Sequence, residues 1–322
     1  MHHLMIRSTL LAAGLAAAGA ALAAAPSSDP AYPTRPVRMT VTFPPGGGAD
    51  FVARILAQHM TANMGQQVVV ENRPGADGTI GVQVAARATP DGYTVVFANN
   101  GPLTLSPILN DRLQYDPLKD LSYISLVIAY PFILAARPSL PVKSTKELIE
   151  LARAQPGTLN FGSSGTITRL AMVLFQSMTK TEVKDIPFNG NGPTIVAVLG
   201  SHVDLMLAGP SVPQLRNGQL KSIAVTGARR SGAHPDVPTL AESGLPGYDV
   251  TSWAGVIGPR ALPPPLVTRL HGEISKTLKQ QDVRERIETA GLDVVNSTPA
   301  EFTALVKTEL KKWATVVPLM KK

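Results

Sequence analysis

The strongest constraint on the fold is a regular alternation of strand and helix patterns along the chain. Apolar and polar residues alternate from Val37 to Phe43, glycine and proline then interrupt the pattern, and a helical pattern runs from Asp50 to near Gly65. Further strands are expected at 68–71, 93–98, 159–161, 183–188, 203–207 and 250–257, and further helices at 79–87, 168–178, 194–199, 266–279, 282–290 and 299–316. Such an alternation favours mostly parallel sheets with helices on both faces.

Two helix starts carry recognisable caps. Ser144 and Glu147 form the pattern of a capping box before an apolar helical face. Thr298, Pro299 and Glu301 give a second start, with proline at the first helical position. Both sites predict where a helix begins.

The N-terminus is typical of a secretory leader. An apolar, alanine-rich run covers residues 10–22, which is shorter than the roughly 20 residues that a bilayer requires. Ala21-Leu22-Ala23 offers the small residues at which a signal peptidase cuts. We therefore predict that residues 1–25 are a signal peptide, cleaved between Ala23 and Ala25. The chain has no cysteine, which excludes a disulfide framework and a lipidated cysteine and favours a periplasmic location.

The length that remains predicts two domains. About 300 residues are more than one hydrophobic core usually organises. We expect residues 31–129 plus 253–322 to form the first domain and residues 130–252 the second. The chain would then cross twice between the domains, near Tyr130 and Ser252, and leave a cleft between them.

The formal net charge of +7 raises the question of nucleic acid as a partner. The basic residues are scattered, however, and adjacent basic pairs occur only at Arg229-Arg230, Lys311-Lys312 and Lys321-Lys322. No nucleic-acid partner is expected from this pattern. A diffuse positive field instead favours encounters with small anions.

A glycine triplet between a strand and a helix is the sharpest candidate for a binding site. Residues without a Cβ let backbone N–H groups converge on an anion, and the dipole at the start of the helix adds to the attraction. A tight turn without a ligand is the alternative. The candidate ligand-binding residues here are Phe43, Pro44, Gly46, Gly47, Gly48, Ala49 and Asp50.

A second loop of the same kind lies in the other half of the chain, between an expected strand and helix. Its candidates are Ser163, Ser164, Gly165 and Thr166, whose hydroxyl groups could equally cap the helix. Ligands of open α/β sheets bind beyond the carboxyl ends of strands. That rule adds Asn99, Asn100, Asn189, Gly190 and Gly209, although asparagine beside glycine is also ordinary turn chemistry.

Enzymatic motifs are absent from the sequence. No P-loop string occurs, and Gly162-Ser163-Ser164-Gly165 has its second glycine one position too early for a nucleophile elbow. The histidines after the leader lack the spacing of metal ligands. We therefore expect no catalytic residue, no metal and no cofactor. A hydrolase that uses the glycine loop as an oxyanion site stays open as the less favoured alternative.

Four segments together resemble a known family. Phe43–Asp50, Val70–Ala76, Asp91–Thr94 and Asn160–Gly165 are similar, in this order, to signatures of the Bug family, the receptors of tripartite tricarboxylate transporters. The resemblance implies a two-domain fold like that of periplasmic binding proteins, with a ligand cleft between the domains. It also implies a carboxylate ligand gripped by backbone groups of two loops, hinge closure, and delivery to integral-membrane permease subunits.

The sequence indicates the family more clearly than it indicates the ligand or the membrane partner. Where the family usually has glycine and histidine, this chain has Ile167 and Arg169. Arg169 could bind a second carboxylate, which suggests a dicarboxylate ligand, or it could equally point to solvent. A secreted sensor that binds the same acid and partners a signalling membrane protein is the alternative. We expect a monomer.

Overall fold

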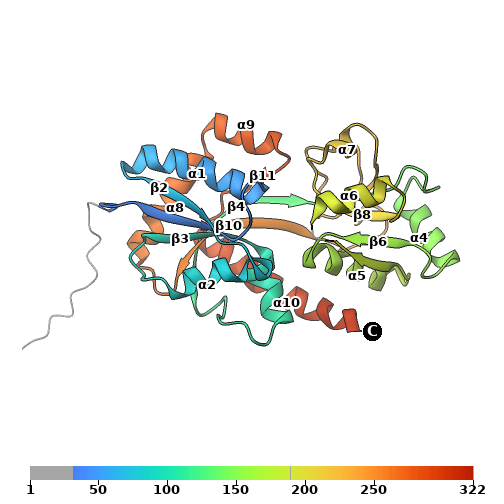
Figure 1. Ribbon diagram of the computed structural model, residues 1–322, viewed down its shortest axis with the longest axis horizontal. Coiled ribbons are helices and arrows are strands. Elements are labelled where there is room, and N and C mark those ends of the chain that lie inside the picture. Colours follow the sequence, from blue (N-terminus) through green and yellow to red (C-terminus); the bar gives the residue numbers. More distant parts are fainter. Residues whose placement is uncertain (1–31, 189, 322) are drawn as a thin grey trace, which may run out of the picture.

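The chain folds into two lobes that lie side by side, each built on one sheet with helices on both faces (Figure 1). The computed structural model describes residues 32–188 and 190–321. The predicted leader and Asn189 lie outside the described residues. The α/β class with two sheets is confirmed.

The first lobe holds a six-stranded sheet in the order β11-β4-β10-β3-β1-β2. Its elements are β1 (Val37–Val41), α1 (Gly48–Met64), β2 (Val68–Asn72), η1 (Ala76–Gly78), α2 (Thr79–Arg87), β3 (Thr94–Asn99), the π-helical turn η2 (Gly101–Leu105), α3 (Ser106–Leu109), β4 (Leu121–Pro131), β10 (Thr251–Pro259), α8 (Pro264–Leu278), α9 (Gln281–Thr289), β11 (Asp293–Val294) and α10 (Pro299–Val316). Helices α1 and α8 cover one face of this sheet, and α2 and α10 cover the other.

The second lobe holds a five-stranded sheet in the order β7-β6-β8-β5-β9. Its elements are β5 (Ile133–Ala136), α4 (Thr145–Ala154), β6 (Asn160–Ser163), α5 (Thr166–Thr179), β7 (Lys184–Pro187), α6 (Asn191–Leu199), β8 (Leu205–Ala208), α7 (Pro213–Arg216) and β9 (Lys221–Val225), and the turn η3 (Val317–Lys321) follows α10. Helices α4 and α5 pack on one face and α6 on the other.

The alternation of strands and helices predicted mostly parallel sheets, but both sheets are mixed. β1, β2 and β3 are parallel to one another, as are β6, β7 and β8. The strands β4, β10 and β11 in one lobe, and β5 and β9 in the other, extend these ladders with antiparallel pairs. The antiparallel part of each sheet adjoins the connection between the lobes.

The strands β4, β5 and β9 have no counterpart among the expected elements. Ile124, Val127 and Ile128 of β4 are buried, and so are all four residues of β5. A strand buried on both faces carries no apolar and polar alternation, so its sequence gives no period of two.

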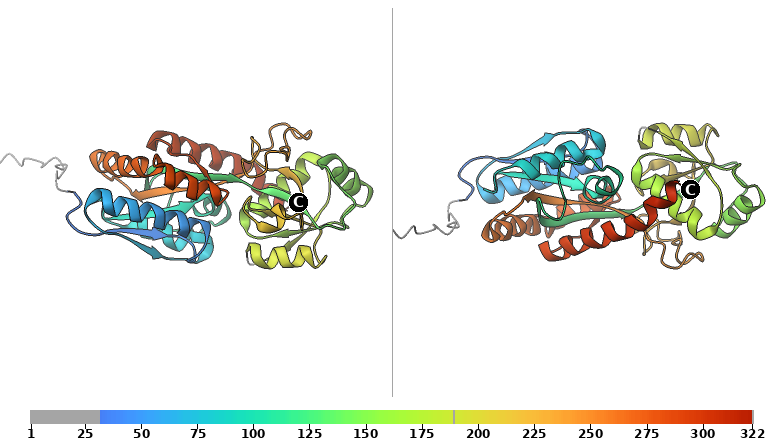
Figure 2. Two further views of the ribbon diagram at one scale, coloured as in Figure 1. Left: turned by 90° about the horizontal axis from the view of Figure 1, so that it is seen from above. Right: turned by 90° about the horizontal axis from the view of Figure 1, so that it is seen from below.

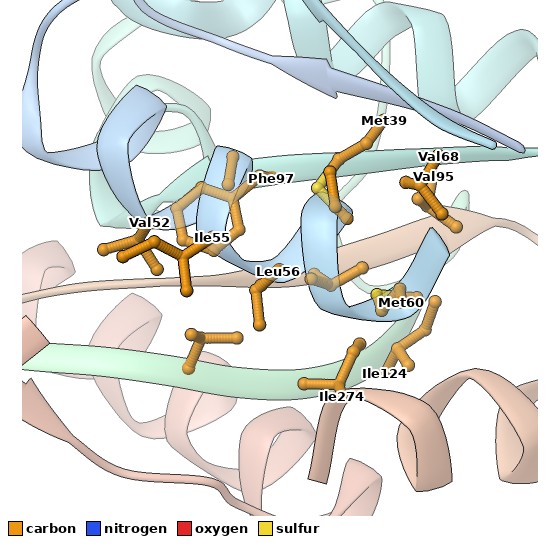
Figure 3. Close-up of a cluster of buried hydrophobic side chains, with 14 of the residues drawn as sticks. Met39, Val52, Ile55, Leu56, Met60, Val68, Val95, Phe97, Ile124 and Ile274 are labelled. Atoms are coloured by element: carbon orange, nitrogen blue, oxygen red, sulfur yellow. The ribbon is translucent and has the colours of Figure 1, made fainter. Parts of the chain in front are cut away.

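The core of the first lobe fixes the start of α1. Val52, Ile55 and Leu56 on one face of this helix pack toward Met39 of β1 and Phe97 of β3 (Figure 3). All five side chains are almost fully buried. This packing holds the loop before α1 at the carboxyl end of β1.

Two long strands and one helix connect the lobes. β4 and β10 pair with each other, and Tyr130 lies opposite Ser252 where both strands pass toward the second lobe. Helix α10, red in Figure 2, begins on the first lobe with buried Phe302 and ends with Trp313 in the core of the second. The expected division at 130 and 252 stays a prediction, and α10 packs on both lobes rather than on the first alone.

The cap of α10 matches its prediction in full, and the cap of α4 matches it only in part. Thr298 and Glu301 form a complete capping box at the start of α10. At α4, the Ser144 hydroxyl accepts the N–H of Glu147, but the Glu147 carboxylate accepts the N–H of Lys143 rather than that of Ser144. The reciprocal bond is therefore shifted by one residue.

Gly255 provides a test of this packing. A Cβ at Gly255 in β10 would lie 2.5 Å from the carbonyl oxygen of Ser125 and 2.6 Å from Cε1 of Phe302. Gly255→Ala should therefore destabilise the protein by about 1 to 3 kcal/mol through overpacking. As a control, Gly272→Ala in exposed space on α8 should stabilise it by about 0.5 to 1 kcal/mol. Thermal unfolding measures both, and equal melting temperatures for the two variants would contradict this packing.

Candidate functional site

A pocket of about 620 Å³ lies between the two lobes. Its residues come from the loop before α1, the end of β3, the crossing strands β4 and β10, the start of α6 and the residue before β11. They are Phe43, Pro44, Pro45, Gly46, Gly47, Gly48, Ala49, Asn99, Ile128, Tyr130, Gly190, Asn191, Ser252, Trp253, Ala254 and Leu292. Both lobes and the connection between them thus contribute to one cavity.

The glycine loop presents the uncapped start of α1 to this pocket. Gly46 adopts φ +85°, which favours glycine, and Gly47 is the N-cap residue without any side-chain cap. The first N–H groups of a helix have no partner within the helix, so those of Gly48 and Ala49 are available to a ligand. The loop can therefore bind an anion through backbone donors and the helix dipole.

Asp50 lies behind this loop instead of lining the pocket as predicted. Its carboxylate accepts the N–H of Gly46 at 3.0 Å and hydrogen bonds from Arg54 at 2.9 Å and Asn72 at 2.9 Å. Asn72 also donates to the carbonyl oxygen of Phe43, which ties β2 to the loop. The hydrogen bond from Arg54 is the main reason why the pKa of Asp50 falls to about 2. The carboxylate thus stays ionised and fixes the loop conformation.

The second lobe presents the start of α6. Gly190, at φ +97°, is the N-cap residue of α6 and again no side chain caps the helix. Asn191 follows, and its Oδ1 atom is buried without a hydrogen-bond partner in the described part of the protein. Its Nδ2 atom lies 3.9 Å from the place where a Cβ of Gly209 would sit. Gly209 therefore adjoins the pocket, although it is not part of its lining.

The predicted loop at Ser163–Thr166 does not line the pocket. The N–H of Ser164 donates to Oγ1 of Thr168, and that hydroxyl donates to the carbonyl oxygen of Gly165. Ser163 is buried at the end of β6. The hydroxyl group of Thr168 thus bonds within the start of α5, whose N-cap Gly165 has no side-chain cap.

Thr166 of that loop instead interacts with the first lobe. Its hydroxyl hydrogen-bonds the side chain of Asp77, which lies in the left-handed region at φ +55°. Burial raises the pKa of Asp77, and the hydrogen bond from Thr166 opposes that rise. This contact joins the two lobes outside the pocket lining.

Arg169 also lies away from the pocket. Its Nε atom is 3.0 Å from Oδ2 of Asp185 on β7, and the pair lies in a separate hollow near Met320. The guanidinium is thus already matched by a carboxylate. The expectation that Arg169 binds a second carboxylate of the ligand has no geometric support in this structure.

The two asparagines at the end of β3 have different surroundings. Asn99 lines the pocket, and its Oδ1 accepts the N–H of Gly101 at 3.2 Å. Asn100 is fully buried and does not line the pocket. Its Nδ2 atom lies 3.4 Å from the carbonyl oxygen of Thr251, so Asn100 holds the end of β3 against β10.

Several pocket residues were absent from the sequence-based site. They include the apolar residues Ile128, Ala254 and Leu292, whose side chains carry no donor, acceptor or charge that would mark them as candidates for binding an anion. Tyr130 and Ser252 were predicted only as crossing points, yet both line the pocket and their side chains interact. Burial raises the pKa of Tyr130, so its hydroxyl is neutral at physiological pH.

The described residues contain neither a group of three potential metal ligands nor a helix whose length and apolar character would suit a membrane crossing.

The chain matches the family model described as "Tripartite tricarboxylate transporter family receptor" over residues 52–321. The chain belongs to this family. The resemblance to the Bug receptors is thereby confirmed. Since the family consists of receptors, the expectation that the chain is not an enzyme is also confirmed.

Curated relatives and solved structures agree with the family. The chain is 35% identical to "Protein BugT" of Bordetella pertussis over 299 residues, which cover 91% of this chain and 92% of that protein. The solved periplasmic binding protein BugD is 34% identical, with a TM-score of 0.76 and coverage of 88% and 97%. A solved R. palustris protein with adipate is 31% identical, with a TM-score of 0.80 and coverage of 89% and 98%.

The network around Asp50 predicts a pH-dependent stability difference. Because the pKa of Asp50 is lowered from 3.8 to about 2, its ionised form stabilises the fold above pH 4, and this contribution is lost as the pH falls toward 2. Asp50→Asn should cost about 1 to 2 kcal/mol at neutral pH, since Arg54 is half exposed and its bond is screened.

Chemical denaturation between pH 6 and pH 2.5 measures this effect. The difference between the wild type and Asp50→Asn should shrink as the pH falls. Asp236→Asn, at an exposed position, serves as the matched control and should change stability little at any pH. A deficit of Asp50→Asn that is independent of pH would contradict the role of the ionised carboxylate.

Proposed function

We propose that this protein is a periplasmic receptor that binds a small organic carboxylate in the pocket between its lobes and delivers it to a membrane permease of the tripartite tricarboxylate type. One observation carries the proposal. The uncapped N-termini of α1 and α6, which belong to different lobes, open on the same pocket. Each supplies backbone donors and a positive dipole end, which is the chemistry that an anion requires.

The relatives and the charge of the chain support a carboxylate as the anion. The R. palustris relative was solved with adipate, which carries carboxylates. The net charge of +7 favours the approach of small anions. Each hydrogen bond to a charged group contributes about 1.5 to 3 kcal/mol, so three or four of them can support micromolar binding after the ordering costs.

Hinge closure about the crossing strands is the proposed mechanism. Bending near Tyr130 and Ser252 would bring the start of α6 toward the start of α1 and enclose the ligand. Because the end of α10 packs in the second lobe, the movement would also bend or shift the segment around Trp313. Closure would give the permease a surface that differs between the empty and the loaded receptor.

The proposal also covers the location of the protein, its membrane partner and its oligomeric state. The leader at residues 1–25 and the periplasmic relative BugD support export. Membership in a transport-receptor family favours a permease over a signalling protein as the membrane partner. A monomer would suffice, since one chain supplies both walls of the pocket.

Gly47 offers the cleanest test of the site. A Cβ at Gly47 would meet no atom closer than 3.8 Å, and the residue lines the pocket. Gly47→Val should therefore fold normally and place its methyl groups where the ligand must approach the backbone. We expect the affinity for the best-binding organic acid to fall roughly a hundredfold or more, which corresponds to about 2.7 kcal/mol.

A thermal-shift screen of organic acids followed by calorimetry would measure this loss. Gly232→Val is the matched control, because Gly232 lies in open space outside the pocket lining and should tolerate valine without a change in affinity. Wild-type affinity in Gly47→Val would remove the glycine loop from the site.

A further inference from the structure

The residues that line the pocket also limit the chemistry of the rest of the ligand, beyond its carboxylate group. Every residue that lines the pocket in the described part of the chain is uncharged at neutral pH. Away from the two helix starts, the wall includes the apolar residues Ile128, Ala254 and Leu292 and the ring of Tyr130. Among the described lining residues, Asn99 and Asn191 carry the side-chain amides.

Neither Arg54 nor Arg169 supplies a free cation to the pocket, and the nearby Asp77 has the wrong sign to pair with a carboxylate. Arg54 is bound to Asp50 behind the glycine loop, and Arg169 is bound to Asp185 in another hollow. Asp77 lies near the wall formed by Asn99, because the place of a Cβ on Gly101 is 3.5 Å from Oδ2 of Asp77 and 3.3 Å from Oδ1 of Asn99. An acidic neighbour disfavours a further anion at that wall.

We propose that the ligand carries a single carboxylate on an uncharged, largely apolar body. This inference rests on the proposed function, in which the starts of α1 and α6 hold the carboxylate. Both helix starts would then grip the same head group from opposite lobes, while the body of the ligand lies along Ile128, Leu292 and Tyr130.

Two physical arguments favour this ligand class. A second carboxylate buried against an uncharged wall would lose its hydration without gaining a counter-ion, whereas an apolar body gains from leaving water. The pocket volume of about 620 Å³ lies within the range that encloses a whole small ligand, so there is room for a body beyond the carboxylate.

Matched pairs of acids test the inference by calorimetry on the full-length mature protein. Hexanoate and adipate differ only in a methyl group and a second carboxylate, and 4-methylbenzoate and terephthalate form the corresponding aromatic pair. We expect the monoacid of at least one pair to bind, and to bind roughly tenfold or more tightly than its diacid partner. Tighter binding of the diacids would overturn the inference and would assign one carboxylate to each helix start.

A variant that adds a cation should reverse the preference. Asn191→Lys introduces an ammonium group at a half-buried position of the lining, where it could pair with a second carboxylate. The ratio of diacid to monoacid affinity should rise about tenfold or more in this variant, and circular dichroism would verify its fold. Arg169→Gln is the control and should leave the ratio unchanged, because Arg169 lies outside the pocket. A ratio that changes in Arg169→Gln but not in Asn191→Lys would overturn the inference.

The failure of this inference can be distinguished from that of the proposed function. If the diacids bind more tightly and Gly47→Val abolishes their binding, the carboxylate receptor stands and only the single-carboxylate inference is wrong. If no carboxylate in the panel binds the wild type, both proposals are wrong.

Discussion

The unpaired N–H groups at the starts of α1 and α6 are the feature on which the account depends. Both helices begin without a side-chain cap, at Gly47 and Gly190, and both starts line one pocket. An uncapped helix start leaves N–H donors without a partner inside the helix, and an anion can accept from them with the help of the dipole. The described residues that line the pocket include no cationic side chain, so these backbone groups are the main feature of that lining that would attract a carboxylate.

The rest of the fold positions these two helix starts. The packing of α1 on β1 and β3 and the hydrogen bonds of Asp50 hold the glycine loop in its position in the first lobe. The pairing of β4 with β10 connects the lobes and places Tyr130 and Ser252 at the base of the pocket. Stability and binding are therefore served by different atoms of the same loop: the side chain of Asp50 faces inward, while the N–H groups of Gly48 and Ala49 are left for the ligand.

The sequence predicted the local elements and the first wall of the pocket better than the second wall. The alternation around Val41 and the glycines after it predicted the strand, the loop and the helix in the right place, because these signals are local. The role of that loop in binding an anion stays a prediction. Two successive helix starts, at Gly165 and Gly190, carry similar glycine signals and both were predicted to bind the ligand, but Gly190 lines the pocket and Gly165 does not. The tertiary packing decides this difference, which the sequence alone does not reveal. The doubly buried strand β4 gave no periodic signal at all, and the ion pair of Arg169 with Asp185 depends on how β7 pairs with β6.

A titration of the ¹⁵N-glycine-labelled protein with its best-binding carboxylate, followed by two-dimensional NMR, tests the central claim most directly. The account predicts that the amide signals of Gly46, Gly47 and Gly48 in one lobe and of Gly190 in the other shift together and saturate at the same ligand concentration. The signals of Gly232 and Gly272, which lie outside the pocket lining, should stay in place. Saturable shifts confined to glycines outside the two helix starts would contradict the account.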